Sequence, residues 1–130
     1  MDENVNVATN EFPWVTVPME TTEQKLKVFA LTSNPELLKD HDNETLNIIG
    51  WIVERGFRAR GDSQEECVNT TLFTEDGKAL FTQSNGVANA MNRLRPIFPN
   101  GPMGVLKLRS SKVAMKNGNT VRTLIPVFED

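Results

Sequence analysis

The segment ECVNTTLFTEDGKALFTQSNGVANAMNRLRP, residues 66–96, decides the fold because it contains two strand signals and one helix signal in succession. Residues 66–74 alternate and are rich in β-branched side chains, and EDGK is a hairpin signal that leads into ALFTQ. Ser84 or Asn85 can cap a helix that Pro96 ends. The apolar positions of this helix follow helical spacing: Val87, Ala90, Met91 and Leu94. The segment therefore predicts strand, turn, strand and helix.

Strand signals flank this segment on both sides. Upstream, residues 46–53 are apolar on both faces of a predicted strand, and Gly50 and Gly56 offer sites for a bulge or sharp coiling. Downstream, the loop PIFPNGPMG leads to the strand VLKLRSSKVAM, the turn KNGN and the final strand TVRTLIPVF. The order is thus three strands, one helix and two strands.

This order is the connectivity of the OB-fold, a five-stranded, partly open barrel with a helix between its third and fourth strands. We therefore predict an all-β, OB-fold-like barrel with one helix over residues 23–130. Residues 1–22 contain two prolines and four acids and are predicted to be an extended N-terminal arm, whose Phe12 and Trp14 dock on a protein surface. Residues 23–31 form a short element of undecided type. A β-sandwich is the alternative, although it needs no helix at this point.

The composition fits one domain in a reducing compartment. With 130 residues, of which 38% are hydrophobic, the chain can bury a core without disulfides or metal. The single cysteine, Cys67, cannot form an internal disulfide, which favours the cytosol. The N-terminus lacks a signal-peptide pattern, and no apolar run approaches the length of a membrane span. We expect neither a metal site nor a cofactor, since one cysteine and one histidine provide too few ligands.

The charge is unevenly distributed although the net charge is only −3. Residues 1–50 carry nine acidic and three basic side chains, whereas residues 77–128 carry eight basic side chains and no acidic one. The acid-free segment is either a surface for an acidic ligand or a solvated face whose counter-charge lies elsewhere.

No residue pattern predicts an enzyme. His41 stands alone in the polar stretch KDHDN, where Asp40 and Asp42 could orient it, but such a histidine is more often exposed and solvated. Cys67 lies in a predicted strand beside Glu65 and Glu66, which would raise its pKa, so we interpret it as a small buried hydrophobic residue. The glycines form no phosphate-binding spacing ahead of a helix.

Aromatic and basic side chains alternate with apolar ones in the predicted strands. In the first long strand, the odd positions place Trp51 and Arg55 on one face, while the even positions from Leu46 to Ile52 form the core face. Rings beside a basic groove suit single-stranded nucleic acid, because every base offers a π-face and every backbone offers phosphates. Each ring could instead fill the barrel. The candidate nucleic-acid-binding residues are Trp51, Arg55, Phe57, Arg58, Arg60, Phe73, Phe81, Lys107, Arg109 and Lys112.

An ordered set of motifs resembles the single-stranded DNA-binding proteins of small podoviruses with protein-primed DNA replication. The motifs are ETLNIIGW, RGDSQEECVNTTLFTEDGKALFTQS, VANAMNRL and VLKLRSSKVAMKNGNTVRTLIPV, and the resemblance spans residues 23–128. It implies an OB-like protein that coats displaced single strands in the cytoplasm of the bacterial host. The family's DNA-contacting rings are largely tyrosines, which this chain lacks; Trp51 and Phe81 match two ring positions, and a third falls near Phe57.

Two other functions stay open on the residues alone. The chain could be a protein–protein interaction module whose basic half faces an acidic partner. It could also be an RNA-binding OB domain, since the same platform accepts either sugar unless a 2′-hydroxyl is read. The expected partners are single-stranded DNA and replication proteins, with self-association through residues 1–22.

Overall fold

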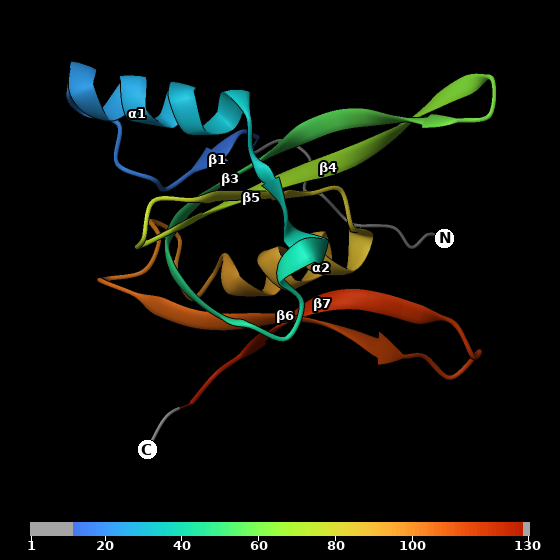
Figure 1. The fold of residues 1–130 in the computed structure, drawn as a ribbon. Helices are drawn as coiled ribbons and strands as arrows, with labels where there is room; N and C mark the ends of the chain where they lie inside the picture. Colours follow the sequence, from blue (N-terminus) through green and yellow to red (C-terminus); the bar gives the residue numbers. More distant parts are fainter. Residues whose placement is uncertain (1–11, 129–130) are drawn as a thin grey trace.

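The computed structural model of the protein describes residues 12–128 and shows a mostly β architecture with two α-helices (Figure 1). The strands form one mixed sheet that curls into a half-barrel, with α2 lying between the β3–β5 part and the β6–β7 part. The elements are β1 (Trp14–Val15), α1 (Thr22–Ser33), β2 (Glu36–Leu37), the 3-10 helix η1 (Leu38–His41), β3 (Thr45–Arg60), β4 (Ser63–Thr74), β5 (Ala79–Thr82), α2 (Asn85–Leu94), β6 (Leu106–Ala114) and β7 (Thr120–Pro126).

The strand order is β2-β5-β4-β3-β6-β7, and β1 lies off this path, paired with Ile52 and Val53 of β3. The five strands predicted from the sequence are β3 to β7, and α2 lies between the third and fourth of them, which is consistent with an OB-like barrel. The prediction of only five strands and one helix is wrong, because β1, β2 and helix α1 are additional. These additions come from residues 12–37, where the sequence signals were weakest.

Helix α2 forms as its local sequence predicts. The hydroxyl of Ser84 accepts a hydrogen bond from the backbone N–H of Val87 (3.2 Å), which caps the first turn. Val87 and Met91 are buried against the sheet. A Cβ at Gly86 would collide with the backbone oxygen of Arg122 in β7, so a glycine is needed where the helix meets this strand.

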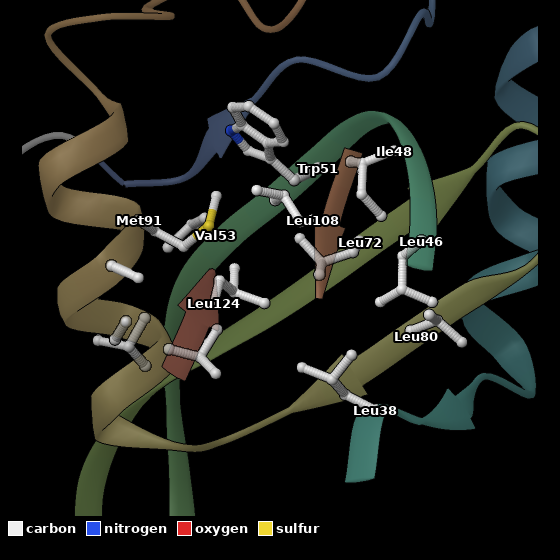
Figure 2. Close-up of a cluster of buried hydrophobic side chains, with 14 of the residues drawn as sticks. Leu38, Leu46, Ile48, Trp51, Val53, Leu72, Leu80, Met91, Leu108 and Leu124 are labelled. Atoms are coloured by element: carbon white, nitrogen blue, oxygen red, sulfur yellow. The ribbon is translucent and has the colours of Figure 1, made fainter. Parts of the chain in front are cut away.

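A bulge in β3 changes which side chains face the core. Leu46 and Ile48 point inward, the pairing with β4 shifts register between Ile48 and Gly50, and Trp51 and Val53 then point inward as well (Figure 2). A bulge inserts one residue and therefore reverses the alternation of the strand. The predicted parity, with Trp51 outward and Ile52 in the main core, is therefore wrong beyond Gly50.

The N-terminal segment packs on its own sheet. In β1, Trp14 pairs with Val53 and is buried, and its ring contacts Trp51 edge-on at a centroid distance of 5.4 Å. The guanidinium of Arg95 lies 4.7 Å from the Trp14 ring centroid, and the indole N–H donates to the backbone oxygen of Pro99 (2.8 Å). The predicted docking of Trp14 is thereby confirmed. Residues 1–11 of the predicted arm lie outside the described residues.

Helix α1 settles the element of undecided type at residues 23–31. Its N-terminus is a capping box in which the Thr21 hydroxyl accepts from the Gln24 N–H (3.1 Å) and the Gln24 side chain accepts from the Thr21 N–H (3.0 Å). Val28 is buried with Phe73 in a small second core on the outer side of the sheet. Neither this helix nor α2 is long and apolar enough to span a membrane, and the same holds for every helix within residues 12–128.

Candidate nucleic-acid interface

Two β-hairpins extend beyond the core toward the same side of the half-barrel, at the right of the view in Figure 1. We call residues 54–66 the β3–β4 tip and residues 111–123 the β6–β7 tip. The β3–β4 tip turns at Gly61, whose φ of +64° suits a two-residue hairpin loop. The β6–β7 tip turns at Gly118, whose φ is +89°, as the KNGN signal predicts. Most candidate cations lie on or beside these two tips.

The inner face of the β3–β4 tip carries an exposed ring. Because Trp51 and Val53 point inward, the alternation along β3 places Arg55 and Phe57 on the same face, beyond the core. The Phe57 side chain is 62% exposed. Directly opposite in the ladder stands Glu66, which accepts a hydrogen bond from Nη1 of Arg55 (2.9 Å). An exposed aromatic ring therefore lies beside an Arg–Glu ion pair.

The outer face of the same tip carries a second Arg–Glu cluster. Arg58 donates from Nε (3.1 Å) and Nη2 (2.8 Å) to Oε2 of Glu65, and from Nη1 to the backbone oxygen of Gln83 (3.0 Å). Nη1 of Arg60 lies 3.0 Å from Oε1 of the same glutamate. The hydrogen bond from Arg58, with the nearby charges of both arginines, lowers the pKa of the Glu65 carboxyl. The three arginines of this tip therefore meet glutamates of the protein itself.

The predicted rings do not gather on one surface. Trp51 is 0% exposed and Phe73 is 2% exposed, so neither offers a ring face to a base, and we remove both from the candidate interface. Trp51 is inward because of the β3 bulge, and Phe73 lies beneath the N-terminal segment and α1. Phe81 is half-buried and pairs with outward-facing Thr71, so it lies on the outer face. The accessible rings, Phe57 and Phe81, thus lie on opposite faces of the sheet.

Gln83 joins the outer cluster to β5 and could not be foreseen as part of the site. Its side-chain amide donates to the backbone oxygen of Phe57 (3.2 Å) and to Oδ1 of Asn69 (2.9 Å), while its own backbone oxygen accepts from Arg58. These bonds tie the end of β5, where Phe81 lies, to the β3–β4 tip. The proximity of Gln83 to Phe57 and Arg58 becomes visible only once the register of β4 with β3 and β5 is known.

In β6, the predicted alternation is confirmed. Leu108 and Ser110 are buried, while Lys107 and Arg109 stand on the opposite, outer face, where they pair with Asn47 and Thr45. Lys112 has the same parity as Ser110 and therefore belongs to the inner face, on the exposed β6–β7 tip. The basic residues of this strand are divided between two faces.

Three cations of the β6–β7 region stand outside the ion pairs of the described residues, although the charge of Lys112 helps to lower the pKa of Asp42. Within residues 12–128, Arg109, Lys112 and Lys116 form no ion pair, and the segment 77–128 contains no acidic side chain. Lys116 was not among the candidates, although it lies beside the KNGN turn in the acid-free segment, which was the available signal. This tip can attract an anionic polymer at long range.

Arg122 holds the base of the β6–β7 tip in place. It donates from Nε (3.0 Å) and Nη2 (2.7 Å) to the two carboxylate oxygens of Asp42, which also accepts from the Ser110 hydroxyl (2.8 Å). The hydrogen bond from Arg122 is the main reason that the pKa of Asp42 is lowered. Asp42 therefore anchors this tip, a role that the predicted loop position did not suggest.

His41 and Cys67, the two side chains considered for catalysis, are held by contacts within the fold. The expectation of a solvated His41 is wrong: its side chain is 13% exposed and contacts Glu36 (2.7 Å) and Glu44 (3.0 Å) in place of the flanking aspartates. The hydrogen bond to Glu44 has the largest effect and raises the pKa of His41, while burial lowers this pKa by less and the hydrogen bond to Glu36 raises it further. Cys67 is buried as predicted, and burial raises its pKa. Residues 12–128 contain no cluster of three or more side chains that could bind a metal ion.

Comparison with known proteins identifies the family. Residues 7–125 match the family model described as Phage Single-stranded DNA-binding protein, which covers most of the chain. No curated protein and no solved structure matches the chain. The match confirms the resemblance seen in the strand, hairpin and helix motifs. The chain therefore belongs to the family of phage single-stranded DNA-binding proteins.

Proposed function

We propose that the protein coats single strands displaced during phage DNA replication in the cytoplasm of the bacterial host, and that it holds them without reading their sequence. Bases stack on Phe57, and the cations of the two hairpin tips contact phosphates. The observation that carries this proposal is the Phe57 ring, which is 62% exposed on a tip that also holds three arginines. The Phe57 ring does not contribute to the hydrophobic core, and stacking on a base would remove it from solvent.

Phe57 supplies the non-ionic part of the proposed binding. Stacking of one base on an aromatic side chain contributes about 1–3 kcal/mol and tolerates every base. Phe81 is a second, half-buried ring on the outer face, linked to the β3–β4 tip through Gln83 and Arg58. A single strand that passes around the edge of the tip would reach both rings.

The β6–β7 tip supplies the ionic part. Lys112 and Lys116 are exposed on this tip, and Arg109 is exposed at its base. Each phosphate that a cation neutralises releases counterions. The logarithm of the binding constant therefore falls linearly with the logarithm of the salt concentration, and each contact to a single strand adds about 0.7 to this salt slope. We include Lys107 on the outer face as a further phosphate contact.

The experiment that tests this function is a titration of fluorescently labelled oligonucleotides followed by anisotropy. We expect binding to mixed-sequence and homopolymeric DNA with similar affinities and a clear salt slope. Tryptophan emission is unsuitable as a stacking signal, because Trp51 and Trp14 are both buried. Strong preference for one sequence, or tighter binding of a matched RNA strand, would contradict the proposal.

Self-association and contacts with replication proteins are further parts of the proposal. Phe12 and Trp14 pack against the protein's own core, so these two rings are not available to a second copy. We therefore assign any assembly role of the N-terminal arm to residues 1–11. Sedimentation of a variant that lacks residues 1–11 should then show fewer copies per assembly than the full chain, and an unchanged number of copies per assembly would refute this role.

A further inference from the structure

Every arginine of the β3–β4 tip is paired with a glutamate of the facing strand. Arg55 is paired with Glu66 (2.9 Å), and both Arg58 (2.8 Å) and Arg60 (3.0 Å) are paired with Glu65. Counting all charged side chains between residues 54 and 66, the tip carries three basic and four acidic groups. The tip is therefore not an electropositive surface, in contrast to the β6–β7 tip.

These pairs change what a phosphate gains by binding here. A phosphate that contacts one of these arginines must displace a carboxylate, which exchanges one charge-assisted hydrogen bond for another of the same type. The displaced carboxylate then repels the phosphate. A ligand that offers only phosphates thus gains little from the tip, and the exchange needs a further favourable contact.

Phe57 provides that contact for a single strand alone. Its exposed ring lies directly opposite Glu66 in the ladder, on the same face as the Arg55–Glu66 pair. Unstacked bases of a single strand can cover this ring, whereas the bases of a duplex are already stacked inside the helix. Stacking on Phe57 is therefore coupled to displacement of Glu66 on the inner face. A strand that continues around the edge of the tip toward Phe81 meets Glu65 on the outer face.

We infer that Glu65 and Glu66 are specificity-determining residues, which keep the tip arginines occupied against duplex DNA and release them to a single strand that stacks on Phe57. This inference rests on the proposed function of the β3–β4 tip. It differs from a simple weakening of affinity, because it predicts different effects on the two forms of DNA.

The test compares a Glu65→Gln/Glu66→Gln variant with a Glu54→Gln/Asp62→Asn control. Both variants remove two negative charges from the same tip, but Glu54 and Asp62 form no ion pair within the described part of the chain. The control therefore reports the general effect of charge. Binding of a labelled oligonucleotide and of its duplex is measured by anisotropy over a range of salt concentrations, with thermal unfolding recorded for both variants.

We expect the duplex salt slope of the Glu65→Gln/Glu66→Gln variant to steepen by about 0.9 for each arginine that gains a phosphate, relative to the control. At about 50 mM salt this corresponds to roughly tenfold tighter duplex binding per contact. The slope for the single strand should match that of the control, because the arginines are already engaged in that complex.

Two results would overturn the inference. A duplex slope equal to that of the control would show that the glutamates do not restrain the arginines. Loss of single-strand binding in a folded variant would show that they position the arginines for DNA instead. If the wild-type protein itself fails to bind single strands, the proposed function fails first; if it binds them and the duplex slope does not move, only this inference fails.

Discussion

Replacing Phe57 by alanine isolates the contribution of base stacking. The ring is 62% exposed and lies beyond the core, so its removal should leave the free energy of unfolding nearly unchanged. Loss of one stacked base costs about 1–3 kcal/mol, which corresponds to about 5- to 150-fold weaker binding of single-stranded DNA. The salt slope should stay constant because no charge is removed.

The matched control for this variant is Phe29→Ala. Phe29 is 69% exposed on α1, so the control makes the same chemical change at a similar exposure, away from both hairpin tips. Anisotropy titrations at low and high salt, with thermal unfolding alongside, separate binding from stability. Equal affinities of Phe57→Ala and the wild type, or an equal loss in Phe29→Ala, would refute the stacking role of Phe57.

Three further predictions concern the core, the charges and the pH dependence. Trp51→Ala should lower the free energy of unfolding by about 3–5 kcal/mol in chemical denaturation, since its ring is fully buried; normal stability with lost DNA binding would return Trp51 to the interface. Lys112→Ala should reduce the single-strand salt slope by about 0.7, whereas Lys25→Ala on α1 should leave it unchanged. Equal salt slopes for the two variants would show that Lys112 does not contact a phosphate. Because Arg122 lowers the pKa of Asp42, this carboxylate stabilises the fold at neutral pH and loses its contribution as the pH falls through its folded pKa. Urea denaturation should therefore show a larger destabilisation by Asp42→Asn at about pH 7 than at about pH 3, and a difference independent of pH would contradict the Asp42–Arg122 anchor.

The parts of the fold that depend on local signals could be predicted from the sequence. Ser84 caps α2 by bonding to a backbone N–H three residues away, and Gly77 and Gly118 supply the positive φ of their hairpin turns. Gly50 was correctly predicted as a possible bulge site, but the reversal of the β3 alternation at this bulge could not be predicted in the same way. A Cβ there would lie 2.8 Å from the Cα of Val17, so the bulge accompanies a close approach of the N-terminal segment, which no local pattern reports.

The candidate site shows the same division. The β6 alternation correctly placed Lys107 and Arg109 outward, because a strand without a bulge keeps its parity. The assignment of Trp51 and Phe73 to the interface was wrong, because both rings are buried. The burial of Trp51 depends on the bulge in β3 and that of Phe73 on α1, and neither is visible in the local sequence. The glutamate partners of the tip arginines were within reach of the sequence: a two-residue turn at residues 61–62 places Arg58 opposite Glu65.

Titration of isotopically labelled protein with a short oligothymidine, followed by backbone amide chemical shifts, tests most directly the claim that single-stranded DNA binds the two hairpin tips. We predict that the largest changes fall within residues 54–66 and 111–123 and on Phe81, whereas the exposed face of α1, including Leu26 and Phe29, stays unchanged. Changes centred on α1 with silent hairpin tips would contradict the proposed interface.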